Sequence, residues 1–192
     1  MGRLGFFFDM AMCIGCRTCQ IACKDKNDLK IGELFRKVKT FETGVYPDPH
    51  LYHYSASCNH CAEAKCVKGC PTGALHYAED GTVQHDKEKC IGCKYCIWNC
   101  PYGVPQFIKE SGIIGKCDTC LDLREQGQNP ACVDACVMRC LEFGDLDELA
   151  AKHGSGLVKE LPISPLASIT QPSLLIKARS YALDSNFRER KV

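Results

Sequence analysis

The sequence predicts a small α+β protein made of duplicated cysteine-rich units, in which bound metal replaces part of the hydrophobic core. The chain has 192 residues, enough for one large domain or two small ones, and 17 of them are cysteines. The 45% of hydrophobic residues includes these cysteines. Without them roughly 36% remains, a modest share for a soluble domain. The net charge is only +1, so we expect no nucleic-acid partner.

Disulfides, zinc sites and iron–sulfur clusters are the three uses that compete for so many cysteines. Disulfides suit small secreted domains. Residues 1–10 (MGRLGFFFDM) have one basic residue and an apolar run too short for a secretory signal. An odd number of cysteines also does not give a closed disulfide set. No stretch is long and apolar enough for a transmembrane helix, so we expect no direct membrane span.

A repeat of cysteine spacing organises the first 140 residues. Residues 9–23 read DMAMCIGCRTCQIAC and residues 86–100 read DKEKCIGCKYCIWNC. A second pattern occurs in CVKGCPTGALHY (66–77) and CVDACVMRCLEF (132–143), each preceded by a C-x₂-C pair. The alternation of the two patterns indicates an internal duplication. It defines group one (Cys13, Cys16, Cys19, Cys23), group two (Cys58, Cys61, Cys66, Cys70), group three (Cys90, Cys93, Cys96, Cys100) and group four (Cys117, Cys120, Cys132, Cys136).

The spacing within the groups favours iron–sulfur clusters. Groups one and three match the bacterial ferredoxin pattern C-x₂-C-x₂-C-x₃-C, in which three thiolates hold one cluster and the fourth serves another. We expect the fourth cysteine to begin a short helix. Zinc sites use separated pairs of ligands, whereas dense runs with proline after Cys70 and Cys100 indicate iron and sulfur. Sixteen ligands divide into four [4Fe–4S] clusters and leave Cys140.

The residues between the groups predict short strands but do not decide which groups pair. Between groups two and three, residues 74–77 and 82–85 read as strands joined by a turn at Asp80-Gly81. Such a hairpin usually links the halves of a two-cluster unit. The distance between groups three and four is similar, so spacing alone also allows that pair.

The chain resembles the iron–sulfur electron-transfer subunits of molybdopterin oxidoreductases of the dimethyl sulfoxide reductase family. The resemblance rests on GFFFDMAMCIGCRTCQIACKDKND (5–28), SCNHC (57–61), KCVKGCPTGAL (65–75), KCIGCKYCIWNCPYGVPQF (89–107), KCDTC (116–120) and NPACVDAC (129–136). It covers residues 4 to about 150 and implies two nested ferredoxin-like units. The inner unit is expected at 50–109, the outer unit at 1–49 and 110–150, and a C-terminal strap or tail at 151–192.

The resemblance also implies which cysteines share a cluster, because the family pairs group one with four and group two with three. The expected sets are Cys13, Cys16, Cys19 and Cys136; Cys58, Cys61, Cys66 and Cys100; Cys90, Cys93, Cys96 and Cys70; and Cys117, Cys120, Cys132 and Cys23. Four clusters in a bent row are thus expected. Cys140 is expected to be a small buried residue, and its alternative role is a ligand in place of Cys136.

By resemblance the chain relays electrons between a quinol-linked membrane anchor and a catalytic subunit that contains molybdopterin with Mo or W. Dimethyl sulfoxide or a related oxide is the expected acceptor. The chain is expected at the membrane through its partners, on either the cytoplasmic or the exported side. No catalytic motif is visible, so substrate chemistry belongs to the partner. The alternative functions are a free-standing polyferredoxin shuttle, an accessory of hydrogenase or formate dehydrogenase, and a structural zinc protein.

The C-terminal region changes in character after residue 150. Residues 145–154 predict a short helix with Asp145 as N-cap and Gly154 as its end. Beyond them the apolar residues are scattered and proline recurs, so this tail cannot form a core of its own. It is expected to lie across the body or a partner, with partial disorder as the alternative.

Overall fold

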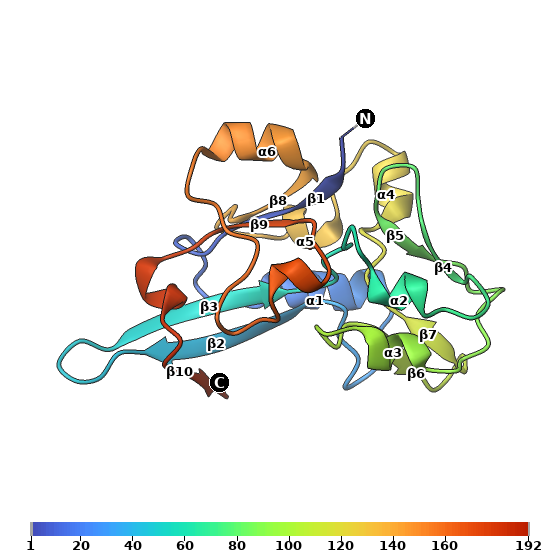
Figure 1. Cartoon of the computed structure of the whole chain (residues 1–192), viewed down its shortest axis with the longest axis horizontal. Coiled ribbons are helices and arrows are strands. Elements are labelled where there is room, and N and C mark those ends of the chain that lie inside the picture. Colours follow the sequence, from blue (N-terminus) through green and yellow to red (C-terminus); the bar gives the residue numbers. More distant parts are fainter. Residues whose placement is uncertain (1, 192) are drawn as a thin grey trace.

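Two sheets of three strands form the larger part of the molecule, which the computed structural model describes for residues 2–191. The first sheet has the order β8-β1-β9 (Leu141–Asp145, Leu4–Asp9, Leu174–Lys177). The second has the order β10-β2-β3 (Phe187–Arg190, Lys37–Thr43, His50–Ala56). β1 runs antiparallel to β8 and parallel to β9, and the second sheet is antiparallel throughout. We call these sheets, with the helices that pack on them, the sheet half (Figure 1).

The aromatic run of β1 places side chains on both faces of the first sheet. Phe6 and Phe8 enter the main hydrophobic cluster, whereas Phe7 packs on the opposite face with Leu149. This alternation follows from the two-residue period of a strand. Leu149 belongs to α6 (Leu146–His153), which covers that face.

The predicted C-terminal helix is confirmed as α6. Asp145 caps it by accepting from the backbone N–H groups of Asp147 and Glu148, and Gly154 ends it with φ +78°.

Four short helices repeat one relation to the cysteine groups. They are α1 (Thr18–Lys26), α2 (Lys65–Lys68), α3 (Tyr95–Asn99) and α5 (Ala131–Asp134). Each contains the third cysteine of its group, and the fourth cysteine follows four residues later. The prediction that the fourth cysteine begins a helix is therefore wrong: it lies in the helix or just beyond its end. A four-residue step is about one helical turn, so the third and fourth cysteines lie about one turn apart along the helix.

The helices pair across the sequence. α1 packs against α5, and α2 packs against α3. A fifth helix, α4 (Leu121–Glu125), follows Cys120 directly.

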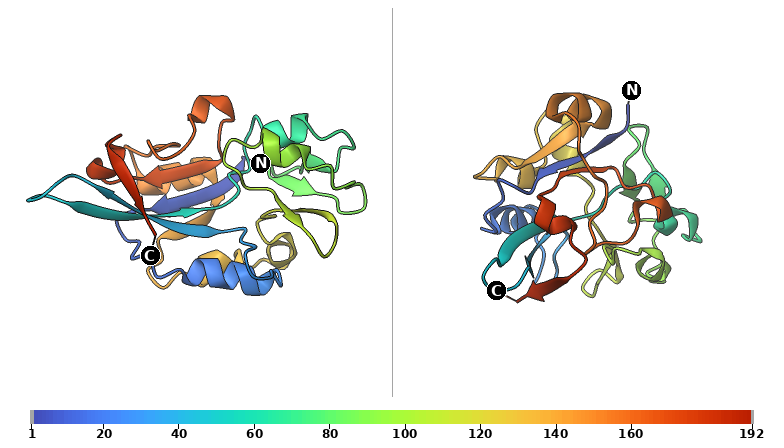
Figure 2. Two further views of the ribbon diagram at one scale, coloured as in Figure 1. Left: turned by 90° about the horizontal axis from the view of Figure 1, so that it is seen from below. Right: turned by 60° about the vertical axis from the view of Figure 1, so that its left-hand side comes forward.

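Two small hairpins lie with α2 and α3 at the other end of the molecule, and together they form what we call the hairpin half (Figures 1 and 2). They are β4 (Leu75–Tyr77) with β5 (Val83–His85) and β6 (Gln106–Ile108) with β7 (Ile113–Gly115). The predicted hairpin at 74–85 is confirmed, with Leu75 opposite His85.

The C-terminal tail, as far as residue 191, lies across both halves. In the sheet half it supplies β9 and β10, and Leu161 and Ile176 are buried in the main hydrophobic cluster. One 3₁₀ turn, η1 (Ala167–Ile169), precedes β9, and a second, η2 (Ser180–Leu183), connects β9 to β10. Toward the hairpin half, the backbone N–H of Glu63 donates to Thr170 O at 2.8 Å, and that of Ser173 donates to Asn59 O at 2.8 Å. The tail is therefore a structural part of the body.

Candidate metal centres

The first candidate centre is a cavity in the hairpin half that joins groups two and three. It is lined by Cys70 of group two and by Cys90, Cys93 and Cys96 of group three. Its remaining wall is largely apolar and includes Leu75. Burial raises the pKa of Cys96 to about 11, so this thiol holds its proton until a metal replaces it.

A second cavity combines the other cysteines of groups two and three. It is lined by Cys58, Cys61, Cys66 and Cys100. Burial raises the pKa of Cys61 to about 11 and that of Cys66 to about 12. Tyr102 Oη lies 3.0 Å from Thr170 Oγ1 beside this cavity, so a residue of the tail helps to form its wall.

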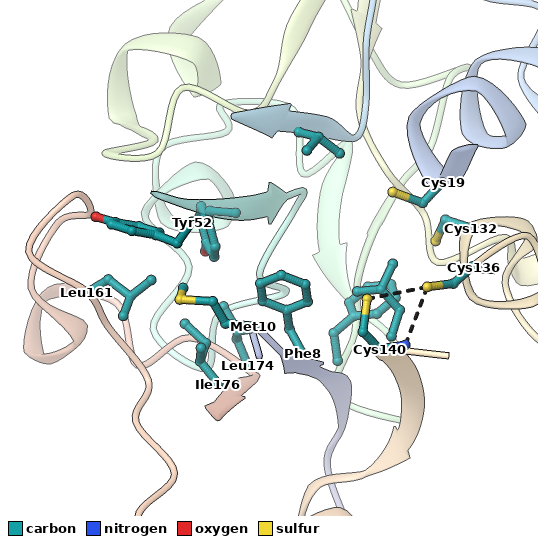
Figure 3. Packing of buried hydrophobic residues seen from close by; sticks show 14 of the residues in the cluster. Phe8, Met10, Cys19, Tyr52, Cys132, Cys136, Cys140, Leu161, Leu174 and Ile176 are labelled. Carbon is teal, nitrogen blue, oxygen red and sulfur yellow. Dashed lines mark hydrogen bonds between the residues drawn. The ribbon is translucent and has the colours of Figure 1, made fainter. Parts of the chain in front are cut away.

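A third cavity lies in the sheet half and joins groups one and four. It is lined by Cys13, Cys16, Cys19, Cys136 and Cys140. Figure 3 shows the sulfur atoms of Cys136 and Cys140 side by side at one end of the main core. Their Sγ atoms are 3.4 Å apart, and the backbone N–H of Cys140 donates to Cys136 Sγ at 3.4 Å.

Cys140 is a hydrogen-bonding neighbour of the cysteines around it. Its thiol also bonds to Cys13, which lowers the pKa of Cys13 to about 7 although burial opposes this shift. The same bond, together with burial, raises the pKa of Cys140 above its ordinary value. Cys140 is buried, as the sequence suggests, but it also lines this cavity.

The remaining four cysteines lie between the sheet half and the hairpin half. They are Cys23, Cys117, Cys120 and Cys132, all buried. Burial raises the pKa of Cys23 to about 12; Arg36 opposes this shift, and Cys132 and Cys120 add to it. Cys23 and Cys117 share an apolar cluster with Cys58, which belongs to the second cavity. This set therefore lies next to a cysteine set of the hairpin half.

Each short helix links two neighbouring sets. α1 carries Cys19 of the third cavity and, one turn later, Cys23 of the set between the halves. The same relation holds for Cys132 and Cys136, for Cys66 and Cys70, and for Cys96 and Cys100. The two sets that a helix links are thus about one helical turn apart along it.

The backbone at groups one and three repeats as the sequence does. Gly15 and Gly92 have φ +70° and +65°, a conformation that glycine adopts without strain. A Cβ atom at Gly15 would lie 2.5 Å from the His53 ring, and one at Gly92 would lie 2.2 Å from Gly112 O. Both glycines are required by backbone conformation and by close packing against neighbouring segments.

The donor chemistry of these sets fits iron–sulfur clusters. All seventeen cysteines are free thiols, and three of the four sets line mostly apolar cavities, as suits the thiolate ligands of a [4Fe–4S] cluster. Zinc would need four ligands about 2.3 Å from one ion. In residues 2–191 no three His, Cys, Asp or Glu side chains converge on such a point.

Two buried cations near these sets were not predicted from the sequence. Arg36 lies just before β2 and is 2% exposed, and Lys116 precedes Cys117 and is 5% exposed. Lys116 Nζ donates to the backbone carbonyl groups of Val83 and Cys117. Arg36 stands among Lys37 and Lys39, which read as ordinary surface charges, so the local sequence gives no sign of its burial.

Helices in the described part of the chain are all too short or too polar to cross a bilayer.

Known proteins with similar sequences fit this geometry. A family model described as a 4Fe-4S dicluster domain matches residues 49–146. One component of the anaerobic dimethyl sulfoxide reductase of Escherichia coli is 43% identical over 91% of this chain and 88% of its own length. The thiosulfate reductase electron transfer subunit of Salmonella typhi is 42% identical over 73% and 74%. The formate dehydrogenase iron-sulfur subunit of Wolinella succinogenes is 37% identical over 80% and 90%. These similarities confirm the family resemblance of the sequence: this protein belongs to the iron–sulfur electron-transfer subunits of dimethyl sulfoxide reductase-type molybdoenzymes.

Proposed function

We propose that this chain relays electrons through four [4Fe–4S] clusters to a molybdopterin catalytic subunit. The observation that carries this proposal is that three separate cavities are each lined by a complete set of four cysteines from two groups. A bound [4Fe–4S] cluster accepts and releases one electron, with a potential that depends on charge, hydrogen bonds and solvent exposure. The chain's own residues hold each cluster, exclude water and separate it from its neighbour.

The ligand assignment follows the four sets of side chains. One set comprises Cys13, Cys16, Cys19 and Cys136; the next comprises Cys23, Cys117, Cys120 and Cys132; the third comprises Cys58, Cys61, Cys66 and Cys100; and the last comprises Cys70, Cys90, Cys93 and Cys96. This order makes a continuous row of two nested units. The short helices support the first and the last link of this row, and the apolar cluster that Cys23 and Cys117 share with Cys58 supports the middle link.

The two ends of the proposed row differ from its middle in exposure. Cys16 and Cys93 are exposed, and they belong to the first and the last set. The cysteines of the two middle sets are buried or half-buried. An exposed ligand at each end gives electrons a way in and a way out, while the middle sets are shielded. We therefore place partner contacts at Cys16 and at Cys93.

The partners follow from the relatives. The relative from Escherichia coli is a component of an anaerobic dimethyl sulfoxide reductase. We propose a catalytic subunit containing Mo or W at one end, a quinol-linked membrane anchor at the other, and dimethyl sulfoxide or a related oxide as terminal acceptor. Association with the membrane is then through the anchor.

Anaerobic purification of the tagged chain from its native cells tests this function, with iron, molybdenum and tungsten measured in the eluate. We expect a large partner that carries Mo or W in proportion to the chain. The control is the untagged chain on the same resin. An iron-rich chain that elutes alone, without Mo or W, would overturn the relay role and indicate a free-standing shuttle.

A further inference from the structure

The Arg36 side chain is a buried cation with unused hydrogen-bond donors. Nη1 donates to Ser55 O at 3.2 Å and to Ser55 Oγ at 3.0 Å. Nε and Nη2 have no hydrogen-bond partner within the described residues, although the side chain is almost completely buried. The guanidinium also lies over the Phe6 ring, 4.7 Å from its centroid.

A buried cation without a counter-ion is costly, so the surroundings of Arg36 must supply negative charge. None of the ion pairs formed by residues 2–191 includes Arg36. Burial by itself lowers the pKa of Arg36, but nearby Cys132 and Cys19 act against burial and hold the pKa above its ordinary value. The candidate counter-charges are therefore these cysteines as cluster-bound thiolates.

Cysteines from two different sets act electrostatically on this side chain. Cys117 and Cys23 also interact with it electrostatically, and with Cys132 they belong to the set between the halves. Cys19 belongs to the third cavity. Arg36 therefore stands between two neighbouring sets of the proposed row.

Ser55 connects Arg36 to Cys19 by hydrogen bonds. Its Oγ accepts from Arg36 Nη1 and lies 3.4 Å from Cys19 Sγ. Because that oxygen accepts from the guanidinium, its own proton is free to be donated to the sulfur. A hydrogen bond to a thiolate stabilises negative charge on it and so favours a reduced cluster.

We propose that Arg36 is a shared electrostatic residue that raises the reduction potential of the clusters at the two neighbouring sets between which it stands. It acts directly on the set of Cys23, Cys117, Cys120 and Cys132, and through Ser55 on the set that includes Cys19. The proposal rests on the proposed function, since it needs clusters at these sets. Reduction adds one electron to a set and moves no proton, because a guanidinium keeps its proton throughout.

The test compares midpoint potentials in redox titrations followed by electron paramagnetic resonance. The sample is the anaerobically purified whole chain with its clusters and any partner that co-purifies. The variants are Arg36→Gln, which removes the charge; Arg36→Lys, which keeps it; and Ser55→Ala, which removes the connection to Cys19 and one hydrogen bond of Arg36 but keeps the charge. The matched control is Lys26→Gln, which removes an exposed cation near Cys120 that is paired with Asp122 at 2.7 Å.

For Arg36→Gln we expect two of the four potentials to fall, each by at least a tenfold change in the reduction equilibrium constant, about 59 mV for a one-electron couple. Arg36→Lys should restore most of the shift, and Lys26→Gln should cause much less. Ser55→Ala should lower one potential only. Unchanged potentials in an Arg36→Gln protein with full iron content would overturn the proposal.

Iron content separates this proposal from the proposed function. A wild-type chain without about four irons per set contradicts the proposed function whatever the variants do. If Arg36→Gln does not assemble, Ser55→Ala and Arg36→Lys decide. The proposal then requires a lowered potential for Ser55→Ala and a nearly unchanged pair of potentials for Arg36→Lys, and the reverse pattern would refute it.

Discussion

The sheet half and the hairpin half hold similar cysteine sets in very different surroundings. The main hydrophobic cluster lies in the sheet half and includes the aromatic side chains of Phe6, Phe8 and Phe41. In the hairpin half the buried cluster is small, and two of its six members are the cysteines Cys66 and Cys96. The hairpin strands are only three residues long.

The difference shows that one cysteine geometry can be supported in two ways. A large apolar core supplies folding free energy whether or not metal is present. A small core does not, and metal binding then contributes directly to folding. The hairpin half should therefore depend on its clusters more than the sheet half does.

Iron removal is the change with the largest expected effect. After anaerobic chelation, amide protons of β4 and β5 should lose nearly all protection from hydrogen exchange, because little apolar packing remains there. Amide protons of Phe6 and Phe8 in β1 should keep most of theirs. Hydrogen exchange read by mass spectrometry measures both regions in one sample. Equal loss in both halves would contradict the comparison.

Truncation of a core side chain in the sheet half should lower the stability of the protein without lowering its iron content. Phe8→Ala removes a buried ring that packs edge-on against Tyr54, with centroids 6.1 Å apart. It should cost about 3–5 kcal/mol of unfolding free energy, read as a lower Tm, while iron content stays the same.

The matched variant in the other half is Leu75→Ala. Leu75 is buried and lines the cavity of Cys70, Cys90, Cys93 and Cys96, so its truncation should release iron from that set. Iron loss in Phe8→Ala with full iron retention in Leu75→Ala would contradict the comparison. The link between local packing and iron binding would then be stronger in the sheet half than in the hairpin half.

A smaller effect is expected at the ion pair that joins the hairpin turn to α4. Asp80 Oδ2 lies 2.8 Å from Arg124 Nη1, with side chains 22% and 12% exposed. Asp80→Asn should cost roughly 1–3 kcal/mol in urea unfolding at pH 7. Asp122→Asn, which breaks the more exposed pair with Lys26, should cost about 0–1 kcal/mol. Equal costs would show that burial of the first pair is unimportant.

The Asp80 pair also has a defined pH dependence. Burial raises the pKa of Asp80, but hydrogen bonds from Thr82 and the charge of Arg124 together lower it below its ordinary value. The carboxylate therefore stabilises the fold above the ordinary Asp pKa of about 3.9, and this contribution is lost as pH falls through the lower folded-state pKa. The gap between wild type and Asp80→Asn should narrow only below about pH 4.

The smallest expected effect on iron content is that of Cys140→Ala. Because the third cavity has four other cysteines, the variant should keep roughly sixteen irons per chain. Cys136→Ala should lose about four. Chemical iron assays of the two variants decide whether Cys140 is a cluster ligand or only a hydrogen-bonding neighbour of the ligands. Loss of about four irons from Cys140→Ala would make Cys140 a ligand.

Sequence reasoning predicted the local features best. The cysteine groups, the hairpin at 74–85 and the cap of α6 at Asp145 depend on residues close together in the chain. The C-x₃-C step was expected to place the fourth cysteine at the start of a helix. The structure places the third cysteine in the helix instead, and the fourth follows about one helical turn later.

The long-range features could not be predicted from the sequence. β9 pairs with β1 across most of the chain, with Leu174 beside Phe6, and short strands with little alternation give no sign of such a partner. The burial of Arg36 likewise depends on Ser55 and Phe6, which are distant in sequence. The cysteines predicted to form each set from the family resemblance do line common cavities in three cases, while their role as ligands remains a prediction.

The most direct test of the central claim is the iron and acid-labile sulfide content of the anaerobically purified chain. Four clusters on sixteen cysteines predict about sixteen irons and about sixteen sulfides per chain. About eight of each would contradict the account, because only one pair of neighbouring sets would then hold clusters.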